Sequence, residues 1–212
     1  MDRRELLKMI AVLTGGVVIG GDVFLTGCKT AGKTDAGFTA ANISLLDEIG
    51  ETIIPATNTP GAKAAQVGEF MKVMVTDCYT QKQQAAFTNG IVNFEDACKK
   101  ANSKSFLECS PQQRHDFLVT LEKEAKTFNT KRDETDKPAR DANDKNNETL
   151  PWRDQKEFEG SPSHYYTMMK QLTLLGFFTS KTGMKDTLRY LPVPGKYDGN
   201  LPYVKGDKAW AE

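Results

Sequence analysis

The sequence predicts an all-α protein: an irregular bundle of five or six helices with long loops and an extended, proline-rich C-terminal tail. Three observations lead to this prediction. Apolar residues recur at helical spacing in five separate stretches of the chain. Helix-start signals precede several of these stretches. No stretch has the pattern of a β-strand, so no sheet is expected.

The first predicted helix spans residues 39–54. Thr39 can cap its start, and Phe38 can pack against Ile43 one turn later. Pro55 ends the helix, because the residue before a proline is driven out of the helical conformation. Residues 56–62 (ATNTPGA) then have the composition of a loop.

Two further helices follow, over about 67–79 and 81–101, and both carry apolar residues at helical spacing. Ser110-Pro111 starts a fourth helix, with Ser as N-cap, Pro in the first position and Gln113 as the partner of a capping box. Its apolar face runs as far as Phe128.

The pattern breaks at residues 129–149, where charged residues dominate and no apolar face remains. We expect a mobile loop or an exposed excursion there. Ser161-Pro162 repeats the start signal, and a fifth helix should carry Tyr165, Met168, Met169, Leu172 and Leu175 before it ends near residues 176–180.

The N-terminal residues predict an export signal. A charged start that contains Arg3 and Arg4 precedes a glycine-rich apolar stretch from Met9 to Leu25. The sequence around the two arginines resembles a twin-arginine signal. The LTGC run that ends at Cys28 resembles a lipobox, in which a diacylglyceryl group is added to the cysteine sulfur.

An anchoring transmembrane helix is the alternative for this apolar stretch. Its glycines and Asp22 weaken it as a span, because a central Asp costs roughly 2.5–3.5 kcal/mol on insertion scales. The lipobox interpretation predicts a signal peptide over 1–27, a polar tether over 28–37 and a helical domain over 38–212. It places that domain at a membrane surface, held there by the lipid on Cys28.

Charge and composition exclude several classes of protein. The 212 residues include 28 Lys and Arg against 28 Asp and Glu, so the formal net charge is zero. This balance excludes a nucleic-acid binder that works through bulk positive charge, and we expect no nucleic-acid partner. The mean hydropathy of −0.50 excludes a polytopic membrane protein.

The chain carries none of the short motifs that common catalytic or cofactor sites require. It has no GxGxxG, GxxxxGK[ST], GxSxG, HExxH or CxxC run. His115 and His164 have no carboxylate or cysteine beside them at metal-ligand spacing. We therefore predict no catalytic, cofactor-binding or metal-binding residue in this chain.

The cysteines lead to a separate prediction. If Cys28 is lipidated, Cys78, Cys98 and Cys109 remain in an oxidising compartment. Cys98 and Cys109 flank the turn between the third and fourth helices, so an intrachain disulfide between them is a candidate. The remaining cysteine is then buried and free, or bonded to another chain.

Aromatic residues near the C-terminus predict a partner interface. Tyr165-Tyr166 and Phe177-Phe178 are adjacent pairs, and neighbours on a helix point about 100° apart, so one of each pair should leave the core. The tail adds Tyr197 and Tyr203, between prolines that restrict the chain before docking. We expect residues 192–204 to lie on a partner or in the groove beside the fifth helix; packing on the chain's own bundle is the alternative.

Five sequence blocks resemble one known family. LLDEIGETIIP at 45–55 is followed by TNTPGAKAA at 57–65 and VGEF at 67–70, and LTLLGFFTS at 172–180 is followed by PVPGKYDG at 192–199. These blocks, together with the twin-arginine start, resemble the gluconate 2-dehydrogenase subunit 3 family, also called the gamma or small subunit.

The resemblance implies a non-catalytic accessory subunit. Members accompany a large FAD-binding flavoprotein of the glucose–methanol–choline oxidoreductase type, which oxidises a sugar or sugar acid, often with a cytochrome c subunit. The small subunit carries the export signal and assists export and assembly of the large one, which implies a periplasmic, lipid-anchored location on a bacterial membrane. The alternatives are a free-standing lipoprotein that binds a ligand such as a carbohydrate, and an enzyme in its own right.

Overall fold

The structure is a computed structural model and describes residues 37–193, 195, 199–202 and 204–211. Its α-helices are α2 (Ala40–Ile53), α3 (Val67–Cys78), α4 (Gln81–Asn102), α5 (Pro111–Asn147) and α6 (Tyr165–Thr179). Three short helical segments accompany them: η1 (Ala62–Ala65), η2 (Phe106–Glu108) and the π-helical η3 (Thr182–Thr187). The described residues form no strand, only an isolated bridge, and the all-α prediction is confirmed.

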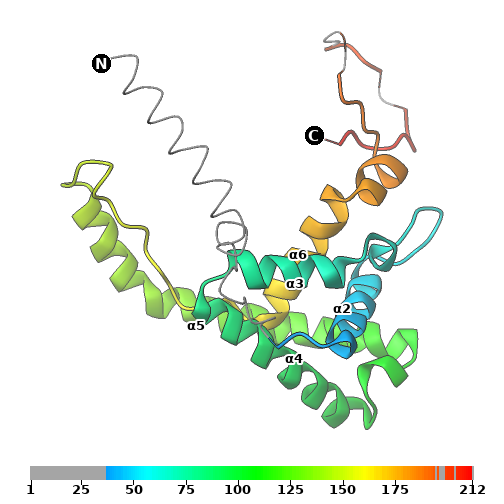
Figure 1. Ribbon diagram of the computed structural model, residues 1–212, viewed down its shortest axis with the longest axis horizontal. Coiled ribbons are helices and arrows are strands. Elements are labelled where there is room, and N and C mark those ends of the chain that lie inside the picture. Colours follow the sequence, from blue (N-terminus) through cyan, green and yellow to red (C-terminus); the bar gives the residue numbers. More distant parts are fainter. Residues whose placement is uncertain (1–36, 194, 196–198, 203, 212) are drawn as a thin grey trace, which may run out of the picture. The chain divides into compact units, whose positions relative to one another are not determined.

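Helix α6 is the central element of the bundle. It contacts α2, α3, α4 and α5, as well as η1 and η3 (Figure 1). Its sequence explains this position. Lys170 is the single charged residue of α6, and apolar residues occupy most of its other positions, on all sides of the helix. Gly176 brings α3 close: a Cβ there would lie 2.6 Å from the ring of Phe70.

Side-chain caps fix the starts of α2 and α5 as predicted. The hydroxyl of Thr39 accepts a hydrogen bond from the amide of Asn42 at 3.2 Å. The hydroxyl of Ser110 accepts one from the amide of Gln113 at 3.3 Å, and the Gln113 side chain accepts one from the Ser110 amide at 2.9 Å. These reciprocal bonds complete the capping box that the sequence indicates.

The predicted start of the fifth helix at Ser161-Pro162 is wrong. Helix α6 begins at Tyr165, and Nδ1 of His164 caps it by accepting a hydrogen bond from the amide of Tyr166 at 3.3 Å. Ser161 instead donates its amide and its hydroxyl to the Asp136 carboxylate, at 2.7 and 2.9 Å. These bonds hold Ser161 against α5 and keep it outside the helix.

The prediction of a mobile loop over residues 129–149 is wrong. Helix α5 continues through most of this segment to Asn147, with Pro138 inside it. None of the residues from Asn129 to Asn147 is buried, so the segment is an exposed excursion in helical form. Residues 148–164 return along this helix and bind it through the polar contacts described below.

The tail prediction is not confirmed in the residues that are described. Arg189 and Trp210 form the isolated bridge, through hydrogen bonds from Arg189 N to Ala209 O at 2.8 Å and from Ala211 N to Arg189 O at 3.0 Å. The described side chains from Leu191 to Trp210 are exposed, so the helical bundle does not bury them.

Several predicted features lie outside the described residues: Arg3, Arg4, Cys28, Tyr197 and Tyr203. In the part of the chain that the structure covers, no helix combines the length and the apolar character needed to cross a bilayer.

Candidate partner interface

Helix α6 has a buried face and an exposed face, and both are apolar. Met169, Leu172 and Phe177 are buried in the core. On the opposite side, Leu174, Leu175 and Phe178 are 39%, 45% and 42% exposed. With Gln171 they follow the spacing i, i+3, i+4, i+7, which places them on one side of a helix. We call Leu174, Leu175 and Phe178 the α6 outer stripe.

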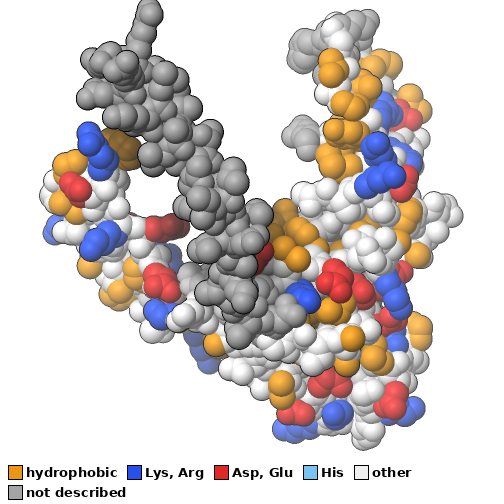
Figure 2. All heavy atoms as spheres, viewed as in Figure 1, with side chains coloured by type: hydrophobic (Ala, Val, Ile, Leu, Met, Phe, Trp, Pro, Cys, Tyr) orange, Lys and Arg blue, Asp and Glu red, His pale blue; other side chains and the backbone are white. Residues whose placement is uncertain are grey.

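The surface around the α6 outer stripe is also rich in apolar side chains. Figure 2 shows hydrophobic side chains gathered over the part of the molecule that contains the C-terminal half of α6, η3 and the segment after it. The residues after η3 add large apolar side chains that are exposed: Tyr190, Leu191, Val193, Leu201, Val204 and Trp210. Such a concentration is typical of a surface that another molecule covers.

The structure describes four of the six aromatic residues that the sequence assigns to a partner interface, and it separates them. Tyr166 and Phe177 lie in the core, whereas Phe178 is exposed on the α6 outer stripe and Tyr165 is half-buried. One residue of each adjacent pair is expected to leave the core, and this holds for Phe177, which is buried, and Phe178, which is exposed. Of the apolar residues expected on this helix, Leu175 lies on the exposed face.

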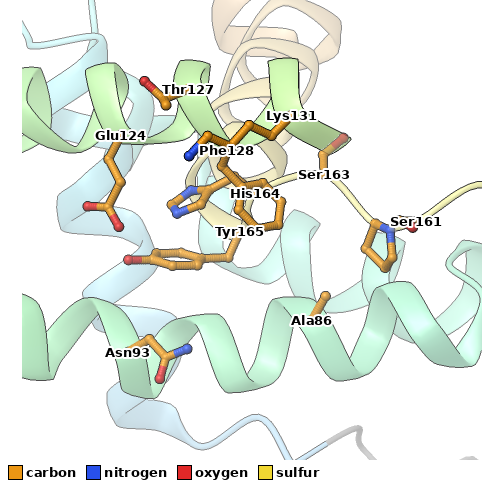
Figure 3. A pocket seen from close by; sticks show the side chains of 11 residues that line it. Ala86, Asn93, Glu124, Thr127, Phe128, Lys131, Ser161, Ser163, His164 and Tyr165 are labelled. Atoms are coloured by element: carbon orange, nitrogen blue, oxygen red, sulfur yellow. The ribbon is translucent and has the colours of Figure 1, made fainter. Parts of the chain in front are cut away.

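Tyr165 lies at a hollow of about 750 Å³ between α4, α5 and the segment before α6. Figure 3 shows its ring between the two helices, with Glu124 on α5 and Asn93 on α4 at either side. Gly90 permits this placement, because a Cβ there would lie 2.2 Å from Cβ of Tyr165. Burial, with a smaller contribution from the Glu124 charge, raises the pKa of Tyr165 to about 12, so its hydroxyl keeps its proton.

His164 is buried above Tyr165 in the same hollow. Its ring centroid lies 4.2 Å from that of Tyr165 and 5.3 Å from that of Phe128. Burial lowers the pKa of His164, and the negative charge of Glu124 opposes this shift only in part. A neutral ring is also required by its cap, since Nδ1 must accept the hydrogen bond from Tyr166.

Cys98 and Cys109 lie together in the core, as their predicted pairing requires. Their sulfur atoms are 3.9 Å apart, and both residues are buried free thiols in this structure. Burial raises the pKa of Cys98 to about 11. Cys78 is exposed. The disulfide itself stays a prediction.

The carboxylates of α2 hold the loop between α2 and α3. Glu51 accepts hydrogen bonds from the amides of Ala56 and Lys63, at 2.8 and 2.9 Å. One turn earlier, Asp47 accepts one from the amide of Gly68, in the first turn of α3, at 2.8 Å. Glu51 and Asp47 thus bind backbone amides at three positions of the segment that follows α2. These hydrogen bonds fix the path of residues 55–68.

Comparison with protein families gives one match. A family model described as gluconate 2-dehydrogenase subunit 3 matches residues 40–195, which is more than half of the chain. The chain belongs to this family. The match begins at the first residue of α2 and includes every α-helix in the described part of the chain. No curated protein and no solved structure matches this sequence.

Membership in the subunit 3 family implies a dehydrogenase complex and a dehydrogenase subunit as partner. Two of the blocks that resemble the family, residues 45–55 and 172–180, have structural roles in the bundle. In the first block, the α2 carboxylates bind the amides of the loop that follows, and in the second, Gly176 receives Phe70 while Phe177 enters the core. Both blocks therefore build the bundle, and the apolar side chains of Leu174, Leu175 and Phe178 in the second block stay exposed.

Proposed function

We propose that this chain is a non-catalytic accessory subunit of a periplasmic, membrane-associated flavin dehydrogenase complex that oxidises a sugar or sugar acid. It assists the export and assembly of the large flavoprotein subunit, which carries FAD, and a cytochrome c subunit accompanies them. The match to the subunit 3 family over residues 40–195 is the observation that carries this proposal.

The α6 outer stripe supports a role as a subunit. A helix that carries apolar residues on all sides is most stable when neighbouring elements cover every side. In this chain the bundle covers the side of α6 with Met169, Leu172 and Phe177 and leaves the opposite side exposed. A large partner with an apolar patch would cover Leu174, Leu175 and Phe178. Transferring apolar area from water at about 25 cal/mol per Å² would then contribute to assembly.

The export role is tested by replacing both arginines of the N-terminal signal. In cells that make the complex, Arg3→Lys with Arg4→Lys should leave this chain and the dehydrogenase subunit in the cytoplasm, because the twin-arginine route carries folded proteins. Cell fractionation with antibodies to both subunits measures the result. Both subunits in the periplasm of the double variant would contradict the export role.

The membrane attachment is tested at Cys28. Cys28→Ser removes the sulfur that would carry the lipid, and the chain should move from the membrane fraction to the periplasmic soluble fraction. If the variant stays with the membrane and its N-terminus is intact by mass spectrometry, the segment is a retained transmembrane anchor instead.

A free-standing lipoprotein that binds a carbohydrate is the second candidate, and the hollow beside Tyr165 favours it. The hollow combines the rings of Tyr165 and Phe128 with the polar groups of Asn93, Glu124 and Lys131. Such mixed linings suit small polar ligands. Calorimetric titration of the purified chain with sugars and sugar acids tests this candidate; heat of binding from the isolated chain would favour it.

A further inference from the structure

Residues 129–163 form a projecting arm that has no hydrophobic core of its own. The arm consists of the second half of α5 and the segment that returns beside it. At about 1.5 Å per residue, helical residues 129–147 extend roughly 28 Å. Figure 1 shows this end of α5 and its returning segment projecting beyond the other helices of the bundle.

Polar contacts hold the returning segment against the helix along the whole arm. Near its end, the side-chain amides of Asn143 and Asn147 both donate to the carbonyl of Lys156, at 3.0 and 2.8 Å, and the Lys156 amide donates to Asn147 at 3.1 Å. In the middle, Asp136 binds Ser161 twice. These contacts place the returning segment alongside α5 from the end of the helix to the middle of the arm.

The base of the arm is fastened to α6 as well. Asn129 accepts a hydrogen bond from the amide of His164 at 3.0 Å and donates one to the hydroxyl of Thr167 at 2.9 Å. Arg132 donates to the hydroxyl of Ser163, within the arm. The two bonds of Asn129 connect the arm to α6 and to His164, the residue that caps α6.

The end of the arm presents a tryptophan to solvent. Trp152 is 79% exposed, more than any other large apolar side chain in the described residues. The Arg153 guanidinium lies 5.9 Å from its ring. Trp and Arg are enriched among the residues that dominate binding energy at protein interfaces, and a rigid support lowers the entropy lost on docking.

The charges around Trp152 favour a protein over a lipid surface as its partner. Within eight residues on either side, the sequence has three positive residues (Lys145, Arg153 and Lys156) and five negative ones (Asp144, Glu148, Asp154, Glu157 and Glu159). An anionic membrane attracts clusters of positive charge, and this mixed set, in which negative residues outnumber positive ones, gives no such attraction. A complementary surface must present both signs around an apolar pocket, as protein surfaces do.

We infer that the arm is a second docking element, whose Trp152 inserts into an apolar pocket of the dehydrogenase subunit. This inference rests on the proposed function, because it takes the dehydrogenase as the partner. The charged residues around Trp152 then pair with opposite charges at the rim of that pocket, and the arm sets the orientation of the partner on the bundle.

A photocrosslinking experiment tests the inference in the assembled complex. The photoreactive residue p-benzoylphenylalanine replaces Trp152 in the tagged full chain, in cells that make both subunits, and Val92 on α4 (60% exposed) is the control position. After irradiation, we expect a crosslink from position 152 to a peptide of the dehydrogenase subunit, identified by mass spectrometry, and none from position 92. A crosslink from position 152 to lipid, or no crosslink, overturns the inference.

Binding measurements separate this inference from the proposed function. Trp152→Ser should weaken binding of the dehydrogenase subunit roughly thirtyfold, and Trp152→Phe should weaken it less because an aromatic ring remains. Unchanged binding by Trp152→Ser, with the dehydrogenase still co-purifying, overturns the arm inference and leaves the proposed function standing. A wild-type chain that recovers no dehydrogenase overturns both.

Discussion

Arg114 joins three parts of the chain through one side chain. Its guanidinium donates to the carbonyls of Phe106 and Leu107, at 3.0 and 2.7 Å, and forms an ion pair with Glu48 on α2. Lys63 also donates to Glu48, at 2.8 Å. The hydrogen bond from Lys63 and the contact with Arg114 hold the pKa of Glu48 below its ordinary value.

Arg114→Ala should destabilise the bundle by about 2 kcal/mol, because it removes the ion pair that joins α5 to Glu48, which keeps only Lys63, and the donor that binds the Leu107 carbonyl. Urea unfolding monitored by circular dichroism measures the change. Arg140→Ala, on the exposed arm, is the matched control and should cost less than about 1 kcal/mol. Equal losses for the two variants would contradict the role given to Arg114.

His164 gives the bundle a pH dependence at mildly acidic pH. Burial lowers its pKa in the folded chain, so the unfolded chain takes up a proton at a higher pH than the folded chain does. Stability is therefore fully present above the ordinary pKa near 6.5 and is lost as the pH falls through the lowered value.

His164→Asn removes this titration and keeps a side chain that can cap α6. The fall in Tm between about pH 6.5 and pH 5 should be smaller in the variant than in the wild type. Thermal unfolding at several pH values measures both slopes. An identical slope in the two proteins would show that His164 does not contribute.

The pair Cys98 and Cys109 predicts a redox effect on stability. In an oxidising compartment the two thiols, whose sulfurs are 3.9 Å apart, should form a disulfide, which closes a short loop and stabilises the chain by about 3 kcal/mol. Mass spectrometry after alkylation of the unfolded chain in denaturant measures it, because both residues are buried in the folded chain: Cys78 should be labelled, and the other two only after reduction. Labelling of all three without reduction would refute the bridge.

At the scale of elements, the sequence predicts those helices whose apolar residues face a core. The ranges of α2, α3, α4 and the start of α5 follow from apolar spacing and capping signals, and the structure confirms them. The second half of α5 has no apolar face, and its support comes from Asn143, Asn147 and Asp136, which bind a segment distant in sequence. Apolar periodicity carries no information about such contacts.

The candidate interface was predictable only in part, because apolar spacing alone does not show which face of a helix the bundle covers. Helix α6 carries apolar residues on all sides, so its sequence does not show which side the bundle covers or that Leu175 stays exposed. The role of the α2 carboxylates was also missed. The spacing of Asp47 and Glu51 before a proline loop was the available signal, but their amide partners become visible only in three dimensions.

The α6 outer stripe leads to a prediction about assembly. Leu175→Asp should leave the Tm of the isolated chain within a few degrees, because the side chain is 45% exposed, and should reduce the amount of dehydrogenase that co-purifies at least tenfold. Val92→Asp on α4 is the matched control and should reduce neither. If both variants recover as much dehydrogenase as the wild type, the stripe is not the interface.

At the scale of the whole molecule, the described residues divide into a bundle that supports itself and two surfaces that it leaves uncovered. The bundle has a continuous apolar core, to which each of its α-helices contributes. The α6 outer stripe and the end of the arm both lie outside that core. This division is expected of a subunit, which must fold and also present apolar groups to a partner.

The claim that this chain is a subunit of a flavin dehydrogenase complex is tested most directly by the composition of one particle. This is the particle that an affinity tag on the full chain recovers from detergent-solubilised membranes of its own cells. We predict a dehydrogenase subunit in constant ratio to the chain through gel filtration, identified by mass spectrometry, together with flavin absorbance. A chain that elutes alone, at the mass of a single polypeptide and without flavin, would contradict the claim.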